Sequence, residues 1–334
     1  MLLIGSSEKM KRQWITFLIT WLLSLSVILG GLEAQIRRYS QNKVFLSAIL
    51  IAFALQFALF WLPGFPILRE QFEVHLNRQS RAPVVGGILL IPYAIYATGA
   101  GIWSPASVLK LLSIAAIVLG IYALVPAKSQ RFSWQDMTVM LVIAIPVYTG
   151  WYRDVWPAPV YLDVMVRLFV VSLAAFAILS VRLLTDVGYV WRLETGDWAE
   201  GAKQLVLFSF IGLPLGFALR FIAWQPRSEG IWGIVLSFAG IFLFIAVGEE
   251  LLFRGMLQNL LENSLSNKYV ARGIASAIFG ISHIHHGFPN WRYVIIAAVA
   301  GWFYGTAWHK RRSIVAASVT HAAVDTLWRH FLLT

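Results

Sequence analysis

Six ionisable residues stand within or beside apolar segments in the last part of the chain, where most side chains are hydrocarbon. An ionisable group in a membrane interior costs several kcal/mol, so such groups are functional candidates by default. The six residues are Glu249, Glu250, Arg254, His283, His321 and Asp325.

The acidic pair follows the apolar run 241–247. Glu250 and Arg254 are four residues apart, so a helix places them on one face, where they can form an ion pair. Glu249 points about 100° away from Glu250 and is left as the freer carboxylate. We therefore expect Arg254 to serve a structural ion pair and Glu249 to be available for chemistry.

The two histidines belong to different apolar runs. His283 ends the segment Phe-Gly-Ile-Ser-His at 279–283, and His321 precedes Asp325 by four residues. That spacing lets Asp325 orient the His321 imidazole or bond beside it in one cavity. At about 1.5 Å of rise per residue, these groups and Glu249 lie roughly 12–18 Å from the inner ends of their helices. We expect three helices to bring them to one level.

A carboxylate and an imidazole that hold one water molecule can act together as a general base. His321, with or without Asp325, could then stabilise a tetrahedral oxyanion. Amide hydrolysis is the natural reaction for such a set.

The elements that must position these residues are membrane helices. The 334 residues are 59% hydrophobic and 13% charged, which is far from the composition of a soluble domain. We expect an all-α, polytopic transmembrane helical bundle with about 9–11 spans, because each span needs about 20 apolar residues. The apolar runs lie at 14–31, 44–62, 83–101, 108–125, 137–151, 164–181, 205–222, 231–261, 271–285, 291–308 and 313–332.

Charge and cysteine content narrow the function further. The chain has no cysteine, so a cysteine nucleophile and a thiolate metal site are excluded. The net charge of +11 is scattered among short loops, which fits membrane orientation and not nucleic-acid binding. We expect a retained first span and a cytoplasmic N-terminus, and we divide the chain into regions 1–200 and 201–334 at the charged segment 182–203.

The motifs Glu-Glu-x-x-x-Arg at 249–254, Phe-x-x-x-His at 279–283 and His-x-x-x-Asp at 321–325 together resemble the CAAX-protease and bacteriocin-processing (CPBP, Abi-like) family of intramembrane proteases. The resemblance covers roughly 205–332 and implies a CAAX-type endopeptidase. It further implies that Glu249 and His283 activate water and that His321 and Asp325 form the oxyanion site. The best-studied members have Asn where this chain has Asp325. An ionised Asp cannot donate a hydrogen bond, so Asp325 is either protonated or orients His321.

Other readings of the same residues are open. A zinc peptidase could use Glu249, His283 and His321 as ligands, although no His-Glu-x-x-His is present. His285 and His286 follow closely and could extend a metal cluster, but we interpret them as interfacial loop residues. A transporter could relay protons through the same groups, and a non-enzymatic immunity-type protein could bind through them.

We predict a glutamate-dependent intramembrane endopeptidase with no cofactor, zinc being the alternative. Its catalytic candidates are Glu249, Glu250, His283, His321 and Asp325. Its partners are the lipid bilayer and a membrane-associated or lipid-modified peptide or protein, in a bacterial plasma membrane. The glycines of Gly-x-x-x-Gly at 301–305 should allow close helix packing. No role is predicted for residues 1–200.

Overall fold

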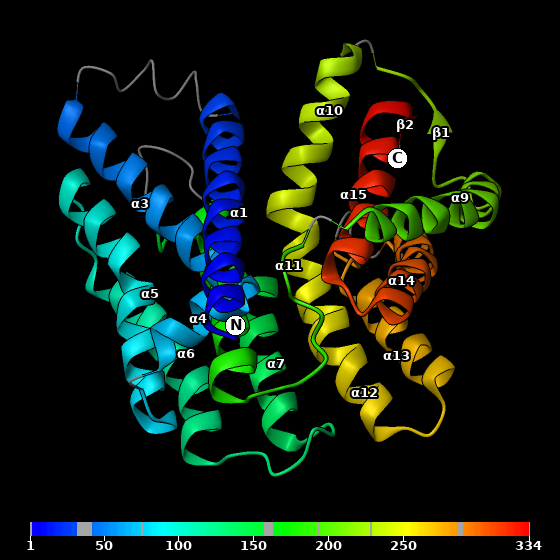
Figure 1. The fold of residues 1–334 in the computed structure, drawn as a ribbon. Coiled ribbons are helices and arrows are strands. Elements are labelled where there is room, and N and C mark those ends of the chain that lie inside the picture. Colours follow the sequence, from blue (N-terminus) through cyan, green and yellow to red (C-terminus); the bar gives the residue numbers. More distant parts are fainter. Residues whose placement is uncertain are drawn as a thin grey trace. The chain divides into compact units, whose positions relative to one another are not determined.

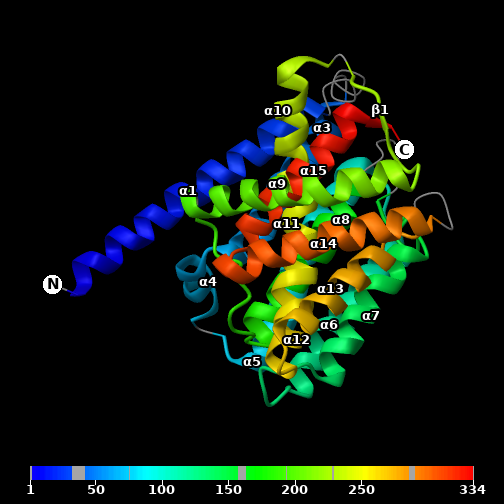
Figure 2. The same cartoon turned by 90° about the vertical axis from the view of Figure 1, so that its right-hand side faces the viewer.

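The computed structural model describes residues 2–31, 42–74, 76–156, 163–192, 194–227, 229–285 and 290–333, and these are mostly helical (Figures 1 and 2). Contacts divide the chain into two compact units. Unit 1 is Met1–Ser129 with Ser133–Thr185, and unit 2 is Gln130–Phe132 with Asp186–Thr334. All six candidate residues belong to unit 2.

Unit 1 is built from helices of widely different length, several of them long and apolar. Its buried Arg182 binds Asp136 with 3.1 Å between Nε and Oδ1, and the Tyr122 hydroxyl donates to the same oxygen over 2.8 Å. These bonds satisfy a charge that is 0% exposed. The elements are α1 (Leu2–Gly31), α3 (Lys43–Trp61), the 3-10 turn η1 (Leu62–Gly64), α4 (Pro66–Glu73), α5 (Arg78–Ala100), α6 (Pro105–Leu124), α7 (Trp134–Tyr148), α8 (Asp163–Phe176) and the π-helical η2 (Ala177–Val181).

Unit 2 contains one long helical column, four further helices and a short two-stranded pairing. Strand β1 (Ala223–Trp224) pairs antiparallel with β2 (Leu332–Leu333), with Ala223 opposite Leu333. The helices are α9 (Thr195–Ala218), α10 (Gly230–Ile241), η3 (Phe242–Ala246), α11 (Val247–Glu250), η4 (Leu251–Gln258), α12 (Asn259–Ser264), α13 (Lys268–Ile281), α14 (Trp291–Arg311) and α15 (Ile314–Phe331).

The elements α10 to α12 join into one helical column, visible in Figure 1. Its segments η3 and η4 are π-helical, and Glu249 and Glu250 lie on the short α-helical turn between them. The apolar run 231–261 predicted the column, but its periodicity did not predict the π-helical segments. Such segments are rare and are often found at functional sites.

Helix α9 begins at Thr195, well before the apolar run 205–222 that predicted it. The early start is stabilised by Asp197, which is 4% exposed. Its carboxylate accepts from Arg311 Nε over 2.8 Å and from the Ser313 hydroxyl over 2.7 Å. Asp197 therefore fixes the turn between α14 and α15, and with it the start of the helix that carries His321.

Helices α13 and α14 approach closely through small residues. A Cβ built on Gly280 would lie 2.5 Å from the Val294 carbonyl oxygen and 2.7 Å from the Ala298 Cβ. A Cβ on Gly301 would meet Phe279 and Arg254, and one on Gly305 would meet the Gln258 side chain. The close packing predicted from Gly-x-x-x-Gly at 301–305 is confirmed, and Gly280 extends it onto α13.

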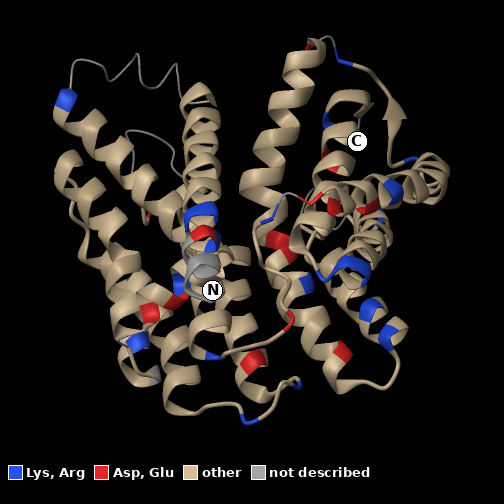
Figure 3. Cartoon of the chain, viewed as in Figure 1, with Lys and Arg blue, Asp and Glu red and all other residues tan. Residues whose placement is uncertain are grey.

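Seven of the described helices are long and apolar enough to cross a membrane, which fits the predicted polytopic bundle. The number is below the nine to eleven spans expected from the sequence. Helices α7 and α13 have only 15 and 14 residues, fewer than the 18 that the shortest of these seven spans has. Charged residues are sparse on most helices in Figure 3, but the middle of the column has both acidic and basic residues.

Replacing Gly280 with alanine should separate α13 from α14, because the new methyl group meets backbone atoms that cannot move aside. We expect Gly280→Ala to lower the free energy of unfolding by about 1–3 kcal/mol. Gly273→Ala is the matched control on the same helix, since its Cβ would meet only Trp302, at 3.9 Å. Thermal unfolding in detergent measures both. Equal midpoints for the two variants would contradict the close contact.

Candidate active site

The predicted ion pair between Glu250 and Arg254 is present and completely buried. Arg254 Nε lies 3.0 Å from Glu250 Oε2, and both side chains are 0% exposed. The Arg254 guanidinium also lies over the rings of Phe279 and Tyr304, at 5.0 and 5.9 Å from their centroids. Aromatic faces stabilise a desolvated cation. Arg254 is thus held by one carboxylate and two rings.

The other oxygen of Glu250 reaches a second helix. His321 Nδ1, on α15, lies 2.8 Å from Glu250 Oε1, and His321 is 3% exposed. A buried carboxylate is stabilised when both oxygens have partners. Arg254, Glu250 and His321 therefore form one continuous buried polar chain, which fixes the plane and position of the imidazole.

The opposite edge of the His321 ring faces two further carboxylates. Its Nε2 lies 3.5 Å from Asp325 Oδ2 and 3.9 Å from Glu249 Oε2. Both carboxylates are partly exposed, Glu249 by 36% and Asp325 by 39%. Of the two acidic neighbours in sequence, Glu250 faces the interior and Glu249 faces the accessible side, as their spacing predicted. Asp325 lies where it can orient His321.

His283 lies in the turn that follows α13 and not on the helix itself. Its Nδ1 is 2.8 Å from the Phe279 carbonyl oxygen and 3.1 Å from the Ser282 hydroxyl. When Nδ1–H donates to that carbonyl, the neutral ring carries its lone pair on Nε2. His283 is thus held in one orientation by the end of α13.

Phe279 is the aromatic centre around which these groups are arranged. Its centroid lies 4.6 Å from that of His283 and 5.8 Å from that of His321. It also meets Phe253 and Tyr304 edge-on, at 5.0 and 5.8 Å. One ring of α13 therefore contacts residues of the column, α14 and α15, so the spacing between the two histidines depends on it.

Tyr304 was not among the residues singled out from the sequence. Its ring stacks on His321 with centroids 4.6 Å apart and planes 10° from parallel. Tyr304 stands beside Trp302 and Phe303 between Gly301 and Gly305, and only the fold reveals which of these rings faces the imidazole. Tyr293 was also missed, and its ring lies 5.1 Å from that of His283.

Within the described part of the chain, no three His, Asp or Glu side chains are grouped closely enough to hold a metal ion. The proposed zinc set of Glu249, His283 and His321 is not such a group. His286, considered from the sequence as an extension of a cluster, lies outside the described residues.

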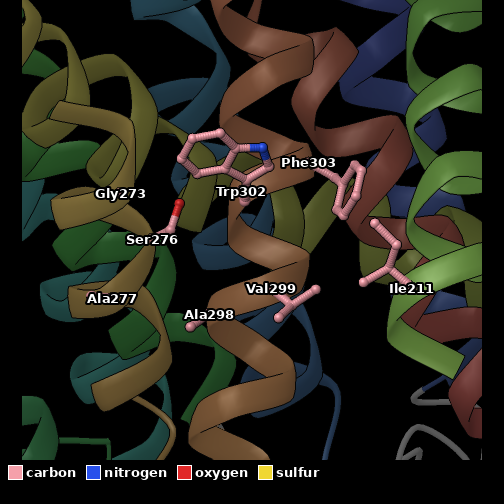
Figure 4. A pocket seen from close by; sticks show the side chains of 8 residues that line it. All are labelled: Ile211, Gly273, Ser276, Ala277, Ala298, Val299, Trp302 and Phe303. Carbon is pink, nitrogen blue, oxygen red and sulfur yellow. The ribbon is translucent and has the colours of Figure 1, made fainter. Parts of the chain in front are cut away.

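A groove of about 420 Å³ lies between α9, α13 and α14 (Figure 4). Its lining is almost entirely apolar, and Ser276 contributes a hydroxyl that has no hydrogen-bond partner. None of the candidate catalytic residues lines it. The lining residues are Ile211, Gly273, Ser276, Ala277, Ala298, Val299, Trp302 and Phe303.

Comparison with known families gives one match. Residues 231–327 match the family described as "Type II CAAX prenyl endopeptidase Rce1-like". The matched segment contains all three motifs, so the resemblance expected from them is confirmed. Comparison with curated proteins and with solved structures gives no match.

Breaking the buried pair should destabilise the protein, because the removal of either residue leaves the other buried without its ion-pair partner. We expect Glu250→Gln and Arg254→Ala each to cost about 3–5 kcal/mol. Glu194→Gln is the matched control, since Glu194 pairs with Arg311 at 3.2 Å but is 49% exposed, and exposed pairs contribute about 0–1 kcal/mol. The measurement is the unfolding midpoint in detergent. Losses of similar size in all three variants would refute the assignment.

Proposed function

We propose that this membrane protein cleaves a peptide bond of its substrate with a water molecule activated by Glu249 and His283. The match of residues 231–327 to the Rce1-like type II CAAX prenyl endopeptidases, a family of hydrolases, supports this reaction. The observation that supports the proposal best is the difference in burial and contacts between the two adjacent glutamates. Glu250 is buried and bound at both oxygens, whereas Glu249 is 36% exposed.

Glu249 acts as the general base on this account. A partly exposed carboxylate can be reached by water, and the low-dielectric surroundings favour proton transfer to it. The His283 Nε2 lone pair accepts a hydrogen bond from the same water and holds it for attack. The hydrogen bond from His283 to the Phe279 carbonyl, at 2.8 Å, selects the tautomer that this role requires.

His321 stabilises the oxyanion that forms when water attacks. Its Nδ1 faces Glu250 and its Nε2 faces Asp325 and Glu249. Both ring nitrogens are therefore best satisfied as N–H donors. Nε2–H can then donate to the developing oxyanion, as preorganised donors do in acyl transfer. Asp325 serves to orient His321, in keeping with the 3.5 Å distance between them.

The reaction balances without a further reactant. The water oxygen bonds to the scissile carbonyl carbon, and one water proton passes to Glu249. When the tetrahedral intermediate collapses, the carbon–nitrogen bond breaks and Glu249 returns that proton to the leaving amine. The products are a new carboxylic acid and a free amine, and Glu249 is regenerated as the carboxylate.

The substrate is a peptide or protein segment held at the membrane by an attached lipid. The family is named for prenylated substrates, and the apolar groove of about 420 Å³ supports an apolar chain as part of the ligand. We assign that chain to the surface of α9, α13 and α14.

Cleavage of a peptide library by purified protein tests this function, each peptide being offered with and without a farnesyl group. Glu249→Gln and His283→Ala should lower the rate by about 10²–10⁴-fold, because each removes part of the general base. His321→Ala should lower it by about 10²–10³-fold, through loss of an oxyanion donor. Glu229→Gln, a change at a 43% exposed position, is the control.

Zinc bound to the same samples should be measured in parallel. Cleavage that persists in Glu249→Gln and His283→Ala would contradict the mechanism. One equivalent of zinc in the wild type, with metal and activity lost together in His283→Ala, would favour the metallopeptidase alternative.

A further inference from the structure

A second cavity in unit 2 lies at the end of α13 remote from His283. It has a volume of about 480 Å³ and lies between the α12–α13 connection and the end of α14. Six of its lining residues carry the argument. They are Glu262, Leu265, Lys268, Tyr269, His309 and Arg312.

A buried carboxylate, that of Glu262, forms the floor of this cavity. The Glu262 side chain is 4% exposed, and its carboxylate accepts from Gln258 Nε2 over 2.9 Å. Arg312 Nη2 and His309 Nδ1 lie 3.1 and 2.8 Å from Glu262 Oε2. Glu262 therefore holds an arginine and a histidine at the wall of the cavity.

The cavity as a whole is positive. Glu262 is its one acidic lining residue, whereas Lys268 and Arg312 are permanently charged. Arg312 is 43% exposed even though it contacts Glu262, and its guanidinium rests 4.6 Å from the Trp308 ring centroid. Basic positions at this end of α13 and α14 are visible in Figure 3. An anionic ligand fits this balance of charge.

The rim of the cavity is apolar. Tyr269 is 56% exposed and Leu265 is 36% exposed. Four more exposed residues continue along α13 at spacings of four, four and three, so they form one stripe on the helix surface. They are Val270, Ile274, Ile278 and Ile281. A ligand that uses both surfaces has an anionic head and a hydrocarbon tail.

The position along the membrane agrees with that chemistry. The helix Gly230–Ser264 is a candidate membrane span and ends shortly before the cavity, so Lys268 and Tyr269 lie beyond one end of that span. Basic residues and tyrosines favour that boundary, and basic pockets between membrane helices bind anionic lipid headgroups.

We propose that this cavity binds the phosphate of an anionic phospholipid between Lys268 and Arg312, with the acyl chains along the stripe of α13. The site is separate from the proposed catalytic residues, and its occupation does not depend on cleavage. The chemistry at the head is that of a phosphate group. The exposed stripe is what favours a lipid over free phosphate.

The test uses the full chain in a neutral detergent and follows the thermal unfolding midpoint as ligand is added. The ligands are dihexanoyl phosphatidylglycerol, dihexanoyl phosphatidylcholine and inorganic phosphate. Phosphatidylglycerol should raise the midpoint at concentrations where the other two do not. Lys268→Glu should weaken its apparent affinity about tenfold, because it reverses one interfacial charge.

Two controls separate the site from general charge effects. Lys268 is the first residue of α13. Because an acidic residue in the first turn stabilises a helix, the Lys268→Glu variant should fold. Arg329→Glu makes the same change in net charge at an exposed position near the end of α15, and it should bind phosphatidylglycerol like the wild type. Lys268→Arg should also retain binding.

Three results would overturn the proposal. The first is equal stabilisation by phosphatidylglycerol and phosphatidylcholine, which would show that the charge of the headgroup is not recognised. The second is an equal response to inorganic phosphate, which would remove the lipid assignment. The third is unchanged phosphatidylglycerol affinity in Lys268→Glu.

Discussion

The buried chain from Arg254 through Glu250 to His321 is the constraint on which the arrangement of unit 2 depends. Two charges that are 0% exposed must remain in contact, because an unpaired charge in that environment costs several kcal/mol. The contact to His321, at 2.8 Å, joins the column to α15. Close packing at Gly301 brings α14 against Arg254. The positions of three elements are therefore tied to one electrostatic requirement.

Two partly exposed carboxylates lie beside this buried chain of contacts. Glu249 lies on the same helical turn as Glu250 but faces the accessible side. Asp325 lies across the His321 ring from Glu250. Phe279 separates the two histidines while contacting both. Rigid support under partly exposed groups is what water activation requires, because the catalytic geometry must be held before the substrate arrives.

Much of this site could be predicted because helix periodicity depends on sequence spacing alone. The four-residue spacing of Glu250 and Arg254, and of His321 and Asp325, was sufficient to predict both contacts. Tyr304 could not be chosen over Trp302 and Phe303, since its contact with His321 depends on how α14 and α15 pack. The early start of α9 was missed because Asp197 looked like a loop residue, and its partners Arg311 and Ser313 are distant in sequence.

If Glu249 and His283 act on the same water molecule, a double-mutant cycle of the two residues will reveal it. The kcat/KM of the wild type, Glu249→Gln, His283→Ala and the double variant would be measured on the peptide that the wild type cleaves fastest. Residues that act as a unit show strongly non-additive losses. The double variant should be no slower than the slower single variant, within about threefold on the scale of normal additivity errors. Losses that multiply would contradict it, because they would mean that the two residues contribute independently.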